Sequence, residues 1–132
     1  MKVLLIYPNT MLSTLVPLHF SVLAACLKKE GVEVELFDTT LYKTEEKSFE
    51  EGRVDLLQIK PFNLAEKGIR LKETDVYEDL KKKVASFKPD LIGITIVEDT
   101  WELARSLLES IKDFDIPVIA GGVHVTAVPD EI

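Results

Sequence analysis

Cysteine, histidine and long apolar runs are all scarce in this 132-residue chain, and each shortage excludes a class of protein. The single cysteine, Cys26, cannot form a disulfide framework or a cysteine-rich metal or cluster site alone, which fits a reducing cytoplasm. The two histidines, His19 and His124, lack the close helical spacing of a two-histidine metal site. We therefore expect no metal held by side chains of this chain.

The N-terminal apolar run, Val3 to Tyr7, is too short to cross a membrane and has no small-residue cleavage site. We expect neither a membrane span nor a targeting signal. Sixteen basic and twenty-three acidic residues give a formal charge of −7. An acidic surface repels nucleic acid and anionic membranes, so neither is an expected partner, although a local basic patch could still exist.

Four segments have the length and composition of strands. Val3 to Tyr7 and Leu91 to Val97 are apolar on both faces, which is typical of parallel sheets. Val32 to Asp38 alternates apolar residues with glutamates and predicts a half-exposed edge strand. Ile116 to Ala120 predicts a buried fourth strand that ends at Gly121-Gly122.

Helical spacing separates these strands. Leu18 to Glu30 predicts a first helix, with Phe20, Leu23, Ala24 and Leu27 at helical spacing. Thr74-Asp75 can cap a second helix that buries Val76, Leu80, Val84 and Phe87. Asp99-Thr100 can cap a third that buries Trp101, Ala104, Leu108, Ile111 and Phe114. A connection as long as Thr39 to Thr74 is unusual, so we expect one or two short helices in it.

Strands that alternate with helices predict an α/β domain with right-handed crossovers over residues 1–132. The simplest arrangement is a three-layer, Rossmann-like or flavodoxin-like sandwich with a parallel sheet in the order 2-1-3-4. The chain breaks off at Ile132, where Pro129-Asp130-Glu131 is typical of a helix start. We therefore expect an N-terminal fragment of a larger protein.

Three loops should meet at the carboxyl edge of this sheet, where open α/β folds bind ligands: Pro8 to Val16, Glu98-Asp99, and Gly121 to Thr126. Glycine lets backbone N–H groups approach a ligand closely. The candidate cofactor-binding residues are Pro8, Asn9, Thr95, Glu98, Gly121, Gly122 and His124, and no catalytic residue is expected.

Each candidate also has a purely structural interpretation. Gly121-Gly122 can be a tight turn, and it matches neither a dinucleotide fingerprint nor a phosphate loop. The Thr95 hydroxyl needs a partner, which can be a ligand or a backbone carbonyl. His124 can contact a ligand or cap the next helix, Asp99 fits helix capping, and Trp101 fits core packing.

Four segments carry a resemblance to a known family: MKVLLIYPN, VPLHFSVLAACLKKEGVEVELFD, KPDLIGITIVEDT and IPVIAGGVHVTAVPDEI. Together they cover most of the chain except Thr39 to Thr74. The chain resembles the N-terminal cobalamin-binding domain of radical S-adenosylmethionine enzymes. In that family cobalamin lies over the carboxyl edge, with its nucleotide tail tucked between strands. Thr95 and the Gly121, Gly122 and His124 group match family positions, and the resemblance implies that they contact the tail and the corrin edge.

The chain also departs from related motifs. The Asp-x-His-x-x-Gly motif that supplies a lower histidine ligand to cobalt is absent after the first strand, where Pro8-Asn9-Thr10-Met11-Leu12 stands instead. Cobalamin should therefore bind with neither its own base nor a protein histidine on cobalt. Relatives often carry glycine where this chain has His19 at the start of its first helix. A fifth strand that closes one sheet edge in relatives is missing, so the fourth strand could recruit another chain as a homodimer.

The resemblance implies a cobalamin-binding module of a radical S-adenosylmethionine enzyme, one that transfers methyl groups or rearranges carbon skeletons. The Cys-x-x-x-Cys-x-x-Cys motif is missing, so S-adenosylmethionine and a 4Fe-4S cluster would belong to a C-terminal catalytic domain of the same chain. One alternative is a structural domain that has lost cobalamin. Another is a receiver-like or flavodoxin-like signalling domain. A receiver domain needs an acidic pair after the first strand to bind magnesium, and this chain has no such pair there.

Overall fold

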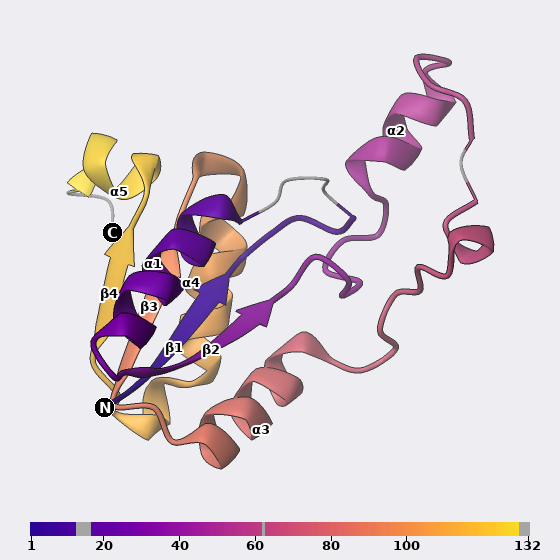
Figure 1. Ribbon diagram of the computed structural model, residues 1–132. Helices are drawn as coiled ribbons and strands as arrows, with labels where there is room; N and C mark the ends of the chain where they lie inside the picture. The colour runs from indigo at the N-terminus through magenta and orange to yellow at the C-terminus, as the bar shows by residue number, and fades with distance from the viewer. Residues whose placement is uncertain (13–16, 62, 130–132) are drawn as a thin grey trace.

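A computed structural model describes residues 1–12, 17–61 and 63–129. Its centre is a four-stranded parallel sheet in the order β2-β1-β3-β4, as the sequence predicts (Figure 1). The strands are β1 (Lys2–Tyr7), β2 (Glu33–Asp38), β3 (Leu91–Thr95) and β4 (Val118–Gly121). In the register, Ile6 lies opposite Phe37 and Ile94, and Thr95 lies opposite Gly121.

The predicted Rossmann-like α/β architecture is confirmed, with helices on both faces of the sheet (Figure 1). The helices are α1 (Leu18–Lys29), α2 (Phe49–Asp55), α3 (Val76–Phe87), α4 (Trp101–Ser110) and α5 (Val123–Ala127). Three single turns of 3-10 helix accompany them: η1 (Ala65–Lys67), η2 (Glu98–Thr100) and η3 (Lys112–Phe114). Within the described ranges no helix is long and apolar enough to cross a bilayer.

The two faces of the sheet have separate cores because successive side chains of a strand point to opposite sides. Leu4 and Ile6 of β1 belong to the larger core, together with β3 residues and the buried faces of α3 and α4. Val3, Leu5 and Tyr7 point to the other face and form a smaller core with Phe20 of α1. On this second face of the sheet, helix α1 therefore covers the half that contains β1.

Helix α3 forms as its sequence predicts. The Asp75 carboxylate accepts hydrogen bonds from the backbone N–H groups of Tyr77 and Glu78, both at 2.9 Å. These bonds satisfy donors that the first helical turn leaves free. The four apolar residues of its predicted face, Val76, Leu80, Val84 and Phe87, are all buried.

Residues 39–74 form an arm that projects from the body of the domain and returns to it (Figure 1). It contains α2 and η1, which confirms the prediction of one or two short helices. Ser48 and Glu51 start α2 as a capping box. At the base of the arm, Tyr42 pairs with Lys72 in an isolated parallel bridge, and the Lys72 N–H donates to the Leu41 carbonyl at 2.7 Å.

The structure corrects the prediction that the fourth strand is buried. Val118 and Ile119 of β4 are 42% and 61% exposed. Strand β4 lies at the edge of the sheet, and in the described part of the chain no helix covers its Ile119 side. An apolar strand is buried only where another layer packs on it.

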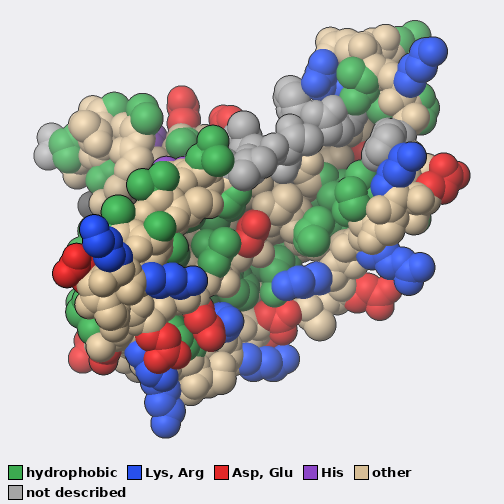
Figure 2. All heavy atoms as spheres, viewed as in Figure 1, with side chains coloured by type: hydrophobic (Ala, Val, Ile, Leu, Met, Phe, Trp, Pro, Cys, Tyr) green, Lys and Arg blue, Asp and Glu red, His purple; other side chains and the backbone are tan. Residues whose placement is uncertain are grey.

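Helix α1 forms where its spacing predicts it, and Leu23 lies with Leu18 and Val22 on its exposed surface, which is rich in apolar side chains (Figure 2). Two other helix predictions need correction. Phe114 is 40% exposed because α4 ends at Ser110 and η3 turns it away from the buried face. Asp99 caps no helix: it lies exposed within η2.

Candidate functional site at the carboxyl edge

The end of β3, the glycine pair and the start of α5 lie together at the carboxyl edge, as predicted. The Ile96 N–H donates to the Gly121 carbonyl at 2.8 Å. The His124 N–H in turn donates to the Ile96 carbonyl at 3.4 Å. These bonds tie the segment after β3 to the segment after β4, so Thr95, Gly121 and Gly122 form one compact site.

Gly122 is required by the protein's own backbone. Its φ is +109°, a conformation that side-chain-bearing residues rarely adopt. A Cβ at this position would lie 2.4 Å from the Ile96 carbonyl oxygen and 2.9 Å from the Ile96 nitrogen. The fold therefore requires glycine at this position even without a ligand.

Gly121 is different, because its backbone is unstrained and open. A Cβ there would have no atom of the described chain within 4 Å. By strand alternation Gly121 shares a face with Ile119, and through the register with Gly93 and Thr95 of β3. We call these four residues the β3–β4 face. Helix α1 covers only the neighbouring β1 half. Within this face Gly93 is crowded by the Leu5 side chain, 3.0 Å from the position of a Cβ, so the face is bare at Gly121.

The Thr95 hydroxyl lies on this face and is available to a ligand. Thr95 is half-buried, and none of the residues that the structure describes hydrogen-bonds its Oγ1 atom. The sequence left a ligand or a backbone carbonyl as partner of the Thr95 hydroxyl, and no backbone carbonyl of the described residues accepts from it. Its Oγ1 would lie 3.1 Å from a Cβ on Gly122, so the hydroxyl stands directly beside the glycine pair.

Pro8 and Asn9 lie at the end of β1, but they are buried. Asn9 is 2% exposed; its N–H donates to Thr39 Oγ1 at 2.7 Å and its side-chain amide donates to Thr40 Oγ1 at 2.8 Å. Asn9 thus joins the loop after β1 to the loop after β2. The predicted loop continues to Val16, and residues 13–16 lie outside the described part of the chain.

Sequence reasoning missed the polar run that follows β2. Thr39 is fully buried, and its hydroxyl lies 2.8 Å from the Asn9 carbonyl oxygen. The Asp38 carboxylate accepts hydrogen bonds from the N–H and hydroxyl of Thr40, at 2.8 and 2.6 Å. The sequence does contain a signal for this arrangement, because adjacent Asp and Thr residues at the end of a strand can hydrogen-bond to nearby backbone groups and fix a turn.

Glu98 is exposed on η2, and no described residue forms an ion pair with it. The turn is held instead by Thr100, whose Oγ1 lies 3.2 Å from both the N–H and the carbonyl oxygen of Val97. Glu98 therefore presents a free carboxylate beyond the end of β3.

His124 lies in a helix rather than in the loop predicted for Gly121 to Thr126. Helix α5 begins at Val123, directly after the glycine pair. The His124 ring lies 5.6 Å from the Trp101 ring, centroid to centroid, and packs α5 against α4. Its Nε2 atom is buried and has no hydrogen-bond partner in the described part of the chain. Trp101 is a packing residue, as predicted. The predicted helix start at Pro129-Asp130-Glu131 falls mostly outside the described residues.

His19 stands in the first turn of α1, close to the end of β1. It is exposed, and its ring centroid lies 4.5 Å from that of Phe20 and 5.8 Å from that of Tyr7. Burial and the nearby Asp38 carboxylate raise the pKa of the Tyr7 hydroxyl, so Tyr7 stays neutral at physiological pH.

In the ranges that the structure describes, no three histidine, cysteine or acidic side chains lie close enough to hold a metal ion.

Comparison with known proteins decides the family. A family model described as the B12 binding domain matches residues 6–132, which is nearly the whole chain. The chain belongs to the B12-binding domain family. The cobalamin-binding part of the resemblance read from the four sequence segments is thereby confirmed. No curated protein matches the chain.

Two solved structures share the fold. Both are of TsrM, a radical S-adenosylmethionine methyltransferase from Kitasatospora setae, at 24% sequence identity. The first, with tryptophan substrate and the SAM analogue aza-SAM bound, has a TM-score of 0.65, and the match covers 97% of this chain and 20% of TsrM. The second, with cobalamin and a 4Fe-4S cluster bound, has a TM-score of 0.64 and coverages of 97% and 19%. The B12-binding domain chain thus spans about a fifth of these enzymes.

Proposed function

We propose that this B12-binding domain holds cobalamin over its carboxyl edge, with the nucleotide tail along the β3–β4 face. The observation that carries the proposal is the Thr95 hydroxyl, which has no partner among the described residues and is flanked by Gly93 and Gly121. A flat, bulky cofactor needs a surface without side chains, and its polar tail needs a donor there. The β3–β4 face supplies the hydroxyl of Thr95 and, at Gly121, a stretch of uncovered backbone beside it.

Cobalt should carry no histidine from this domain. The loop after β1 has no histidine, and Asn9, which stands there, is buried against Thr39 and Thr40. His124 is packed on Trp101. We therefore assign His124 to the support of the glycine pair through α5, and we assign Glu98 to the solvent side of the cofactor edge.

The domain would serve a longer radical S-adenosylmethionine enzyme. This proposal rests on the shared fold with TsrM, a methyltransferase of which the chain spans about a fifth. Cobalamin bound there would supply methyl transfer or carbon-skeleton rearrangement. S-adenosylmethionine and the 4Fe-4S cluster would be held by a C-terminal catalytic domain of the same cytoplasmic polypeptide. The open β4 edge, where Val118 is exposed, is where that domain would contact the sheet, with a homodimer through the same edge as the alternative.

Two other functions remain as outcomes of the test. A structural domain without cofactor would fold normally and fail to take up hydroxocobalamin. A receiver-like domain would accept a phosphoryl group from a small phosphodonor, but its acidic pocket has no counterpart after β1, where Pro8 and Asn9 stand. The family match and the bare β3–β4 face favour cobalamin over both.

Thr95→Val should weaken cobalamin binding by about 1 kcal/mol, a factor of roughly five, because it removes one hydroxyl and preserves the shape of the side chain. Titration with hydroxocobalamin, followed by visible absorption, measures the change. Thr44→Val is the matched control, since the Thr44 hydroxyl is buried without a partner in the described part of the chain and lies on the arm. If Thr95→Val and Thr44→Val bound hydroxocobalamin with equal affinity, Thr95 would not be part of the binding site.

The cobalt(II) form should show no axial nitrogen in its paramagnetic resonance spectrum. His19 stacks beside Phe20 and His124 packs on Trp101, so neither ring is placed in the loop after β1 that holds a cobalt ligand in related domains. His19→Ala and His124→Ala should leave the spectrum unchanged. A nitrogen splitting that disappears in either variant would identify that histidine as a ligand and contradict the assignment.

A further inference from the structure

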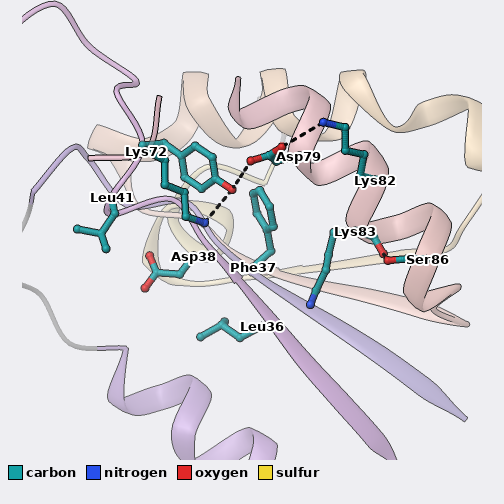
Figure 3. Close-up of a pocket in the computed structure, with 10 residues that line it drawn as sticks. Leu36, Phe37, Asp38, Leu41, Lys72, Asp79, Lys82, Lys83 and Ser86 are labelled. Atoms are coloured by element: carbon teal, nitrogen blue, oxygen red, sulfur yellow. Dashed lines mark hydrogen bonds and ion pairs between the residues drawn. The ribbon is translucent and has the colours of Figure 1, made fainter. Parts of the chain in front are cut away.

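A cavity lies away from the β3–β4 face, at the opposite edge of the sheet. It has a volume of about 610 Å³, within the range of small-molecule sites. Strand β2, both ends of the arm, and helix α3 form its walls (Figure 3). We call it the arm-base cleft. Phe37, which lines it, belongs to the core on the α3 side of the sheet, whereas the β3–β4 face looks to the α1 side.

The two carboxylates of the cleft are already satisfied. Asp38 accepts two hydrogen bonds from Thr40. Asp79 accepts from the hydroxyls of Thr74 and Tyr42, at 2.6 and 3.2 Å, and pairs with Lys82 at 3.5 Å. The hydrogen bond from Thr74 is the main reason that the pKa of Asp79 is lowered, so the carboxylate stays charged at neutral pH.

One of the three ammonium groups of the cleft has no carboxylate partner among the described residues. Lys82 pairs with Asp79. Lys83 pairs with Glu35 at the rim. Lys72 has no carboxylate within 4 Å in the described part of the chain; its ammonium group lies 3.0 Å from the Tyr42 hydroxyl oxygen and 4.2 Å from the ring centroid.

Lys72 is also held in a fixed position. Tyr42 is 2% exposed, and its hydroxyl donates to Asp79, so it can only accept from Lys72. One of the three ammonium donors is used in this way, which leaves two for a ligand or water; Figure 3 shows the Lys72 nitrogen on the Tyr42 hydroxyl. Beside it lies Leu41, which is 38% exposed, whereas Leu36 is in register with Leu5 and belongs to the α1 side of β2. An oriented cation thus stands next to an uncovered apolar side chain.

We infer that the arm-base cleft binds a small organic anion, a carboxylate or phosphate ester with a short apolar body. Its charged end pairs with Lys72, and its apolar body covers Leu41. Because Leu41 and Lys72 belong to the two ends of the arm, such a ligand also joins the arm to the body of the domain. The inference is independent of cobalamin, since the two sites share no residue.

The test uses the same 132-residue chain and three probes: octanoate, octanol and inorganic phosphate. Amide chemical shifts in a nitrogen-15 spectrum report where each probe binds. Octanoate should shift the amides of Leu36, Leu41, Lys72 and Ser86, which line the cleft. Octanol lacks the charge and phosphate lacks the apolar body, so each should bind about tenfold more weakly or not at all.

Lys72→Met keeps the stem over the Tyr42 ring and removes the charge, and it should weaken octanoate binding about tenfold. Lys72→Arg keeps the charge and should bind almost as the parent does. Lys60→Met removes an exposed arm lysine outside the cleft and is the matched control. Octanoate shifts located on α1 or β4, or equal affinities for Lys72→Met and Lys60→Met, would overturn the inference.

Discussion

Gly121→Val is expected to abolish cobalamin binding in a domain that still folds. The backbone of Gly121 is unstrained and a Cβ there meets no atom of the described chain within 4 Å, so the strand can accept a valine. The same open space is where the cofactor would pass. A branched side chain on the β3–β4 face would hold the ligand away from the Thr95 hydroxyl.

The measurement compares retention of hydroxocobalamin after gel filtration, read by visible absorption, with the far-ultraviolet circular dichroism of each protein. Gly52→Val is the matched control, because Gly52 lies in α2 and a Cβ there also meets nothing within 4 Å. The parent and this control should retain the cofactor. A folded Gly121→Val domain that binds as well as the parent would show that the β3–β4 face is not the site. A parent that never binds would favour the structural-domain alternative.

Gly122→Ala, in contrast to Gly121→Val, should lower the stability of the fold itself. The added Cβ would meet the Ile96 carbonyl oxygen at 2.4 Å, and the φ of +109° adds strain for any side chain. Backbone atoms cannot move aside as the end of a flexible side chain can, so we expect a loss of roughly 3 kcal/mol or more in the free energy of unfolding.

Urea unfolding monitored by circular dichroism measures this effect, with Gly121→Ala as the neighbouring control. Gly121→Ala should change the unfolding free energy by less than about 1 kcal/mol, because its Cβ enters open space. If both alanine variants unfold at the midpoint of the parent, the conformation described for Gly122 is wrong. Together the four glycine variants separate a residue required by the fold from one left bare for a ligand.

Local patterns in the sequence predicted the secondary structure and the order of the strands. The β1 run is apolar on both faces because the strand is covered on both sides, and the structure buries Val3 to Tyr7 throughout. Asp75 and the helical spacing of Val76, Leu80, Val84 and Phe87 predicted α3 with its cap and buried face. Strand–helix alternation predicted the parallel order 2-1-3-4, since right-handed crossovers leave few alternatives.

Contacts between distant segments were decided only by the tertiary structure. Ile119 is as apolar as Ile6, yet it is exposed because no layer of the described chain covers its side of β4. Gly121 and Gly122 are adjacent and identical in sequence, but only Gly122 faces the backbone of Ile96. Asn9 is buried by Thr39 and Thr40, about thirty residues away. Lys72 meets Tyr42 and Leu41 because the arm closes on itself at its base. The sequence by itself thus determined the elements and their order, which follow from local spacing. The exposure of a side chain, the conformation of a glycine and the partners of a polar group depend on which segments, distant in sequence, pack against each residue. The spacing of neighbouring residues does not encode those contacts.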